Sequence, residues 1–184
     1  MLAYGSNASP AVLRRKLGPR TAAAVLARPV TLRDTDVVFS AHVSRHGAIP
    51  ATLARSPGTA VGAWLLAVPA DAIAALDATE PNYTREELAG GLQAYVSRHG
   101  ALRIGGSHVA LAAVAAAGRT LPALTEAQLL EQVRARLAPN ETPDGFVLAQ
   151  LTDDRVRARR SAALRRGLPA EAGSMLATRI TDSG

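Results

Sequence analysis

The chain has 184 residues, of which 48% are hydrophobic and 20% charged, and its formal net charge is +6. This length predicts a single domain over residues 1–184, and the composition is typical of globular proteins. The absence of cysteine excludes disulfides, thiolate metal sites and a cysteine nucleophile within this sequence.

The first predicted elements are a short strand and a helix. Residues 1–5 read as a strand that runs into the turn Tyr4-Gly5-Ser6-Asn7, and Ser9 can cap a helix with Pro10 at its first position. Only Leu2 and Ala3 separate Met1 from this turn, and the basic and apolar regions of a signal peptide are not visible. The longest apolar run, near residues 109–118, is too short for a membrane span. We therefore expect a cytoplasmic protein with no membrane partner.

The middle of the chain predicts mainly strands. Apolar segments bounded by Gly, Pro or polar residues indicate strands at 22–32, 34–43, 59–68, 92–98 and 108–114. The last two are expected to be joined through a Gly105-Gly106 turn. A short helix is predicted over 69–78, beginning at Pro69, and Glu80 lies just beyond its end.

The C-terminal part predicts two helices with a strand between them. Thr125 and Gln128 form a capping box ahead of a helix over 126–137. The apolar run 145–151 reads as a strand, and the arginine-rich stretch 153–167 reads as a helix with a solvated basic face. The tail from Leu168 has little pattern and is expected to be loosely attached.

One short repeat is visible, with AHVSRHGA at 41–48 and AYVSRHGA at 94–101. The flanking residues do not match, which does not favour a tandem-repeat fold. We interpret the two copies as strand ends of similar composition. The alternative is that they form a pair of functional loops.

Common catalytic and cofactor motifs are absent from the sequence, including Walker loops, GxGxxG, GxSxG and HExxH. The four histidines lack helical pairing and do not favour a metal site: His42, His46, His99 and His108. Aromatic residues make up only 3%, which does not favour a nucleic-acid partner that stacks bases, although the arginines at 155–166 keep that reading open.

Two stretches carry candidate chemistry: the YGSN turn at 4–7 and LDATEPNYTREEL at 76–88. A turn of small residues between a strand and a helix points several backbone N–H groups in one direction, which suits a carboxylate or an oxyanion. Taken singly, the turn can equally be structural, and Glu80 can be a solvated acid at a helix end.

Together, AYGSNASPAVLRRKL and LDATEPNYTRE resemble the gamma-glutamylcyclotransferase-like family. The resemblance covers residues 1–98, the expected core, and leaves 99–184 as a less characterised C-terminal extension of the same domain. It implies that Glu80 is the catalytic acid/base and that Tyr4, Gly5, Ser6 and Asn7 form the substrate-binding loop. Tyr83 and Arg85 match a YxR pattern of the family, which implies substrate-binding positions in the pocket wall or supporting structure. Pro81 departs from the pattern, because the family usually has glycine there.

The resemblance also implies the fold and the reaction. The expected fold is a single α+β domain built round a small, mostly antiparallel β-barrel with peripheral helices. The expected substrate is a small gamma-glutamyl amine or amino acid, whose alpha-amine attacks its own gamma-carbonyl to give 5-oxoproline and a free amine. This chemistry needs no metal or cofactor, since a carboxylate can take the ammonium proton and later return one to the leaving nitrogen.

Two other functions stay open for the same fold. One is removal of a gamma-glutamyl protecting group from a biosynthetic intermediate, with residues 99–184 shaping a larger acceptor pocket. The other is a non-catalytic ligand-binding protein, which Pro81 and the unmatched C-terminal half favour.

Overall fold

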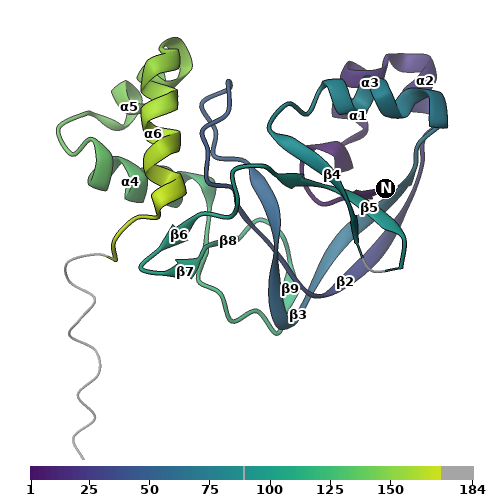
Figure 1. The fold of residues 1–184 in the computed structure, drawn as a ribbon, viewed down its shortest axis with the longest axis horizontal. Coiled ribbons are helices and arrows are strands. Elements are labelled where there is room, and N and C mark those ends of the chain that lie inside the picture. The colour runs from purple at the N-terminus through teal and green to yellow at the C-terminus, as the bar shows by residue number, and fades with distance from the viewer. Residues whose placement is uncertain (89, 171–184) are drawn as a thin grey trace, which may run out of the picture.

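Two long strands organise the fold. In the computed structural model, which describes residues 1–88 and 90–170, β2 (Leu26–Phe39) pairs antiparallel with β3 (Ala51–Ala67). The helices gather in two groups, one toward each end of this twisted hairpin (Figure 1). The predicted strand at 59–68 is therefore the second half of β3.

The strand pair is bent near its middle, at Asp34. The register shifts between Arg33 and Thr35, Asp34 has a φ of 54°, and its side chain accepts a hydrogen bond from the Gly58 N–H at 2.8 Å. The sequence pattern indicates two strands, 22–32 and 34–43, on either side of this point. That prediction is wrong, because β3 pairs with both halves and carries one strand through the bulge.

The other strands extend the hairpin into one mixed sheet. Its order is β10-β8-β2-β3-β1-β5-β4, and β9 pairs with β3. Only the β1–β5 and β10–β8 pairs are parallel among the described strands of this sheet. The added strands are β1 (Leu2–Ala3), β4 (Tyr83–Leu88), β5 (Leu92–Ser97), β8 (Ala110–Leu111), β9 (Ala116–Ala117) and β10 (Ala123–Leu124).

The sheet is mostly antiparallel, as expected, and the chain is an α+β protein. Over the described ranges, its hydrogen-bonded order ends at β10 and β4 and does not close into a barrel. An isolated antiparallel bridge between Ser40 and Ala101 links the end of β2 to the segment after β5.

A small hairpin accounts for the glycine pair. Gly105 and Gly106 connect β6 (Arg103–Ile104) to β7 (Ser107–His108), and both glycines have positive φ. The prediction that this turn joins strands 92–98 and 108–114 is therefore wrong in its partners. The first predicted strand is confirmed as β5, whereas the second is divided between β7 and β8.

Short helices from two parts of the chain, residues 6–23 and 70–78, pack against one end of the sheet. They are the 3-10 helices η1 (Ser6–Ala8) and η2 (Ala70–Ala72) and the helices α1 (Pro10–Leu17), α2 (Pro19–Ala23) and α3 (Ile73–Ala78). Ser9 is the N-cap of α1, with Pro10 at the first position, but its side chain makes no capping hydrogen bond. The apolar faces of α1 and α3 bury Leu13 and Leu76 against Ala3, Leu66 and Tyr95.

Three longer helices cover the other end of the sheet: α4 (Glu126–Leu137), α5 (Pro143–Thr152) and α6 (Asp154–Arg166). The predicted helix 126–137 and its Thr125–Gln128 capping box are confirmed. The arginine-rich helix is also confirmed, as α6. The core here contains Phe39 from β2 together with Leu129, Phe146 and Leu164 from the three helices.

The predicted strand at 145–151 is wrong, since these residues belong to α5. The Thr142 side chain caps this helix by accepting from the Gly145 N–H, and Pro143 occupies the first turn. Phe146 and Gln150, four residues apart, are both buried on its inner face. A short apolar run is compatible with either a strand or a helix, and here the Thr142 cap favours the helix.

The two copies of the repeat form the same turn after a strand end. In each copy the glycine N–H donates to the serine carbonyl, from Gly47 to Ser44 and from Gly100 to Ser97. Both glycines have positive φ, 73° and 75°. The repeat thus encodes a tight turn. The interpretation as a strand end fits the second copy, whose first four residues belong to β5, but not the first copy, which begins after β2 ends at Phe39.

The start of the predicted tail is attached. Leu168 is buried, and its N–H donates to the Arg103 carbonyl at 2.9 Å, whereas the prediction for residues 171–184 lies outside the described residues. Within the described part of the chain, no helix combines the length and apolarity needed to cross a membrane.

Candidate functional site

The turn at residues 4–7 follows β1 directly. Gly5 precedes η1, and Ser6 and Asn7 are its first two residues. Within the described chain, the backbone N–H groups of Ser6 and Asn7 have no hydrogen-bond acceptor. They are the unsatisfied donors expected at a helix start, and they suit an anionic group.

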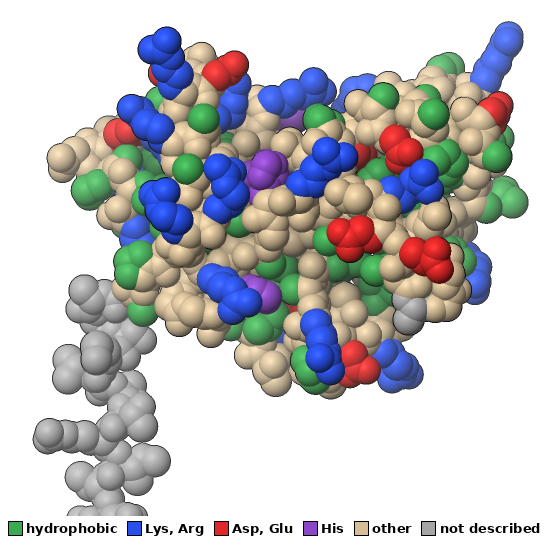
Figure 2. Space-filling view, in the orientation of Figure 1, with side chains coloured by type: hydrophobic (Ala, Val, Ile, Leu, Met, Phe, Trp, Pro, Cys, Tyr) green, Lys and Arg blue, Asp and Glu red, His purple; other side chains and the backbone are tan. Residues whose placement is uncertain are grey.

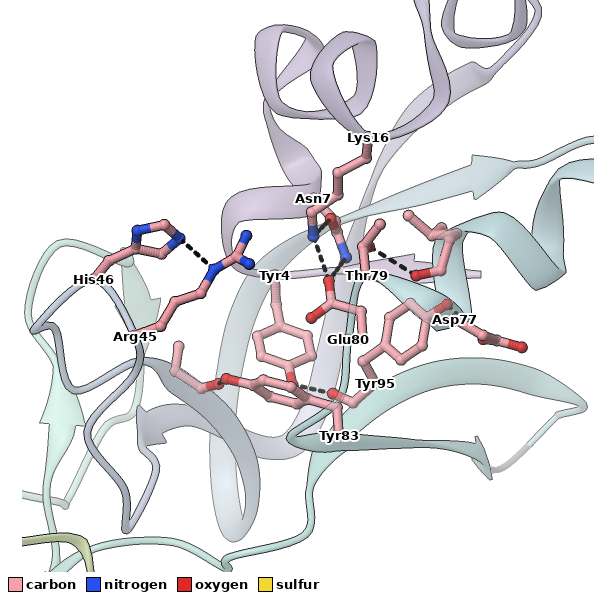
Figure 3. A network of polar contacts seen from close by, with 12 residues as sticks. Tyr4, Asn7, Lys16, Arg45, His46, Asp77, Thr79, Glu80, Tyr83 and Tyr95 are labelled. Atoms are coloured by element: carbon pink, nitrogen blue, oxygen red, sulfur yellow. Dashed lines mark hydrogen bonds and ion pairs between the residues drawn. The ribbon is translucent and has the colours of Figure 1, made fainter. Parts of the chain in front are cut away.

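Glu80 reaches this turn from the end of α3. Its backbone N–H donates to the Asp77 carbonyl, and its carbonyl accepts from the Tyr83 N–H, so a tight turn fixes its position. The Asn7 side-chain amide donates to Glu80 Oε1 at 2.8 Å, across 73 residues of sequence (Figure 3). The structure therefore brings together the two motifs that stand out in the sequence.

Lys16 completes a three-residue network. Its Nζ lies 2.5 Å from Glu80 Oε1 and 2.8 Å from Asn7 Oδ1, and the Lys16 and Glu80 side chains are only 15% and 12% exposed. Sequence reasoning missed this residue. A signal was present, because Lys16 is the single lysine in a chain whose other basic residues are arginine and histidine. A compact ammonium group can meet both oxygens where a planar guanidinium would need more room.

The contacts leave one carboxylate oxygen of Glu80 free. Both donors meet Oε1, and no described residue donates a hydrogen bond to Oε2. Figure 3 shows the carboxylate between the Asn7–Lys16 pair and the rings of Tyr4 and Tyr83. Because Asn7 touches Glu80 directly, no substrate fits between them, and a ligand has to approach on the Oε2 side.

Two tyrosines form the wall next to Glu80. The Tyr4 hydroxyl donates to the Tyr95 carbonyl, and the Tyr83 hydroxyl donates to the Ala51 carbonyl at 2.9 Å. Burial, and then neighbouring charge including Glu80, raises the pKa of both phenols. Both stay protonated at neutral pH, so they can shape the wall and donate but cannot act as bases.

Arg85 is the predicted residue that the structure does not bring to Glu80. It lies on β4 and binds Asp77 and Gln93, with Nε 3.1 Å from Asp77 Oδ1. The Tyr95 hydroxyl donates to the same Asp77 oxygen at 2.6 Å, which together with Arg85 lowers the pKa of this carboxyl group. Arg85 therefore supports the strand and helix end that carry Glu80.

A buried polar cluster lies behind Tyr83. His42 Nδ1 is 2.7 Å from Ser40 Oγ, and Ser40 Oγ is 2.6 Å from Ser97 Oγ. The His42 ring makes an edge contact with Tyr83 at 6.0 Å and lies 4.4 Å from the His99 ring. In the described chain, His42 Nε2 is the one buried side-chain nitrogen or oxygen without a partner.

This buried imidazole predicts acid sensitivity. Burial first, and then His99 and Arg165, lower the pKa of His42 to about 4. An unfolded histidine has a pKa of about 6.5, so between these values the unfolded chain holds a proton that the folded chain lacks. His42 therefore leaves the unfolding free energy unchanged above about pH 6.5. As the pH falls from about 6.5 to 4, it lowers the unfolding free energy by an amount on the order of 3 kcal/mol.

Urea unfolding at several pH values between 7.5 and 4 checks this prediction. The His42→Asn variant should lose less stability over this range than the unchanged chain, whereas His46→Gln, at an exposed site, should follow the unchanged chain. Equal losses for the unchanged chain and His42→Asn would contradict the assignment.

No group of three or more His, Cys, Asp or Glu side chains in the described part of the chain could hold a metal ion. The candidate site instead adjoins an apolar groove of about 550 Å³, whose lining reaches Tyr4 and Ala8 and includes Trp64 on β3. Glu80 does not line this groove.

Comparison of the chain with known protein families, curated proteins and solved structures finds no significant match. Function is therefore inferred from the residues of the two motifs and from their geometry.

Proposed function

We propose that this chain is a gamma-glutamylcyclotransferase-like enzyme with Glu80 as its acid/base. The observation that carries this proposal is the 2.8 Å hydrogen bond from Asn7 to Glu80, which joins the YGSN turn to the acid that follows α3.

The free oxygen of Glu80 is suited to the first proton transfer. Glu80 Oε2 accepts a proton from the substrate's alpha-ammonium group, and the amine nitrogen then attacks the gamma-carbonyl carbon. Glu80 returns this proton to the amide nitrogen as the bond between that nitrogen and the carbonyl carbon breaks, and the ring nitrogen gives up its second proton to the carboxylate or to solvent, which releases 5-oxoproline and the amine. Lys16 and Asn7 hold Oε1 and thereby orient Oε2, so the carboxylate needs little reorganisation.

The turn is suited to the negative charges of this reaction. The free N–H groups of Ser6 and Asn7 can bind the substrate carboxylate or the oxyanion on the gamma-carbonyl, for which each donor contributes on the order of 3 kcal/mol. The apolar groove beside Tyr4 and Ala8 offers a place for an apolar leaving amine. We infer a preference for gamma-glutamyl amines with apolar substituents.

We also propose that the sheet forms part of the expected β-barrel. The Ser40–Ala101 bridge returns the segment after β5 to the end of β2, and the Ser97 N–H donates to Thr52 Oγ1 on β3 at 3.0 Å. These contacts support a sheet that curls into a partial barrel. The candidate site would then lie at one mouth of that barrel, between β1, β4 and β5.

Turnover of a substrate panel tests the activity. Gamma-glutamyl derivatives of alkylamines, aromatic amines and amino acids are incubated with the chain, and 5-oxoproline and free amine are quantified together. The proposal expects the two products in equal amounts from at least one derivative. Release of free glutamate would instead indicate hydrolysis of a protecting group, and no product from any derivative would contradict a cyclotransferase.

A ligand-binding protein without turnover is the second candidate. The contacts of Lys16 and Asn7 with Glu80 favour it, because they satisfy one oxygen and fill the space beside the turn. Calorimetry with the same panel distinguishes the two functions, since this candidate expects binding of a gamma-glutamyl compound with no product.

A further inference from the structure

A second cavity, of about 710 Å³, lies where the end of α6 meets β3 and the β6–β7 hairpin. Six basic or imidazole side chains line it: Arg55, Arg103, Arg165, Arg166, His99 and His108. No Asp or Glu is among its described lining residues. On the face shown in Figure 2, the charged side chains visible between α6 and this hairpin are likewise basic.

The arginines of this cavity are largely free of partners. Arg103 donates to the Gly106 carbonyl at 3.0 Å, whereas Arg55, Arg165 and Arg166 make no side-chain hydrogen bond or ion pair with any described residue. Elsewhere on α6, Arg157 pairs with Asp154 and Arg160 pairs with Glu141 at 2.7 Å, whereas Arg155 and Arg159 are exposed to solvent. The cavity therefore gathers three arginines without a partner among the described residues, and no carboxylate of these residues lines it.

The cavity wall is held in place by backbone hydrogen bonds. The Leu168 N–H donates to the Arg103 carbonyl, and the Gly105 N–H donates to the Leu168 carbonyl, both at 2.9 Å. These bonds fix the segment after α6 beside β6. The arginines thus project from a built frame rather than from an unsupported loop.

Neither the dipole of α6 nor a nucleic-acid surface accounts for all of these residues. Arg165 and Arg166 complement the negative end of the α6 dipole, but this does not explain Arg55 and Arg103 on two other elements. A nucleic-acid surface would use the arginines along the whole helix. Arg155 and Arg159 are exposed, but Arg157 and Arg160 have internal partners, and such a surface does not explain Arg55 and Arg103. A concave site of this volume fits a small molecule.

We propose that this cavity binds the phosphate group of a small phosphorylated molecule or free phosphate. Arginine forks match phosphate oxygens in pairs, and guanidinium groups from three elements can surround a tetrahedral anion. The cavity lies apart from Glu80, and the proposal does not depend on the cyclotransferase activity.

The test uses calorimetry of the full chain at low ionic strength with sodium phosphate, sodium pyrophosphate and ATP without metal. One-to-one binding of at least one probe is expected, and Arg55→Ala or Arg165→Ala should weaken it about tenfold or more. Arg159→Ala is the matched control, since Arg159 is exposed on the same helix and does not line the cavity. Binding of ATP or pyrophosphate but not phosphate identifies a phosphate ester or anhydride as the ligand, and equal binding identifies the free ion.

Histidine resonances give a second readout. Arg165 and Arg103 add to burial in lowering the pKa of His99 and His108, so a bound phosphate should raise both pKa values in an NMR titration. Absence of binding by all three probes would overturn the proposal. So would equal weakening by Arg159→Ala and Arg165→Ala, or binding of a single-stranded oligonucleotide alone, since either result indicates a diffuse basic surface.

Discussion

Replacement of Glu80 by Gln is expected to lower the rate of 5-oxoproline formation by about 10²- to 10⁴-fold, the usual contribution of a positioned acid/base. Glutamine has the same shape and keeps an oxygen toward Lys16 and Asn7, but its amide cannot accept the ammonium proton. The main effect should therefore fall on kcat, with substrate binding nearly unchanged. Initial rates of product formation at saturating substrate measure it.

Two comparisons make the result specific. Glu87→Gln removes an exposed carboxylate on β4 and should leave the rate unchanged. Glu80→Asp keeps the charge opposite Lys16 but withdraws it by one methylene, so it should fold like the unchanged chain and still lose activity. A Glu80→Gln variant that is folded and fully active would contradict the role of Glu80.

Replacement of Asp36 by Ala is expected to lower the unfolding free energy by about 3–5 kcal/mol. Asp36 lies on β2 with no exposed surface, and Arg119 binds it with two hydrogen bonds of 2.8 Å. Arg119 also donates to the Val114 carbonyl and follows β9, so this pair ties the segment after β8 to the sheet. Without Asp36, a mostly buried guanidinium group would lose its counter-charge. Urea unfolding at neutral pH measures the effect.

A double-mutant cycle separates the pair from the cost of an unpaired charge. The cycle compares Asp36→Val, Arg119→Met and the double variant, and the double variant should cost less than either single substitution, because no buried charge is then unpaired. Glu131→Ala, which removes an exposed ion pair with Arg134 on α4, should change stability far less. Additive effects of the two single substitutions at the buried pair would contradict this description.

Local sequence signals predict the elements that local interactions determine. The helix 126–137 is predicted correctly because Thr125 and Gln128 satisfy each other within one turn. The prediction for 145–151 is wrong because the apolar pattern of seven residues fits a strand as well as a helix, and its decisive cap, Thr142, lies outside it. The polar residue Asp34 resembles the end of a strand when the sequence is read locally. Only the pairing with β3, which lies later in the chain, shows that β2 continues through this position.

The candidate site likewise contains residues that the sequence predicts and residues that only the packing of distant elements reveals. The turn at 4–7 and Glu80 can be chosen from the sequence because each belongs to a recognisable motif, but their contact depends on how β1 and α3 pack. Lys16 lies within the stretch AYGSNASPAVLRRKL but outside the turn at 4–7, and only the packing of α1 brings it to Glu80. Arg85 follows the motif pattern yet binds Asp77, because β4 directs it away from Glu80.

A crystal structure of the chain with 5-oxoproline or a non-cleavable gamma-glutamyl analogue tests the central claim most directly. We expect the ligand on the Oε2 side of Glu80, with its nitrogen within hydrogen-bond distance of Oε2 and a ligand oxygen on the free N–H groups of Ser6 and Asn7. A ligand bound away from Glu80, or a Glu80 that keeps Lys16 and Asn7 while the ligand occupies another cavity, would contradict the account.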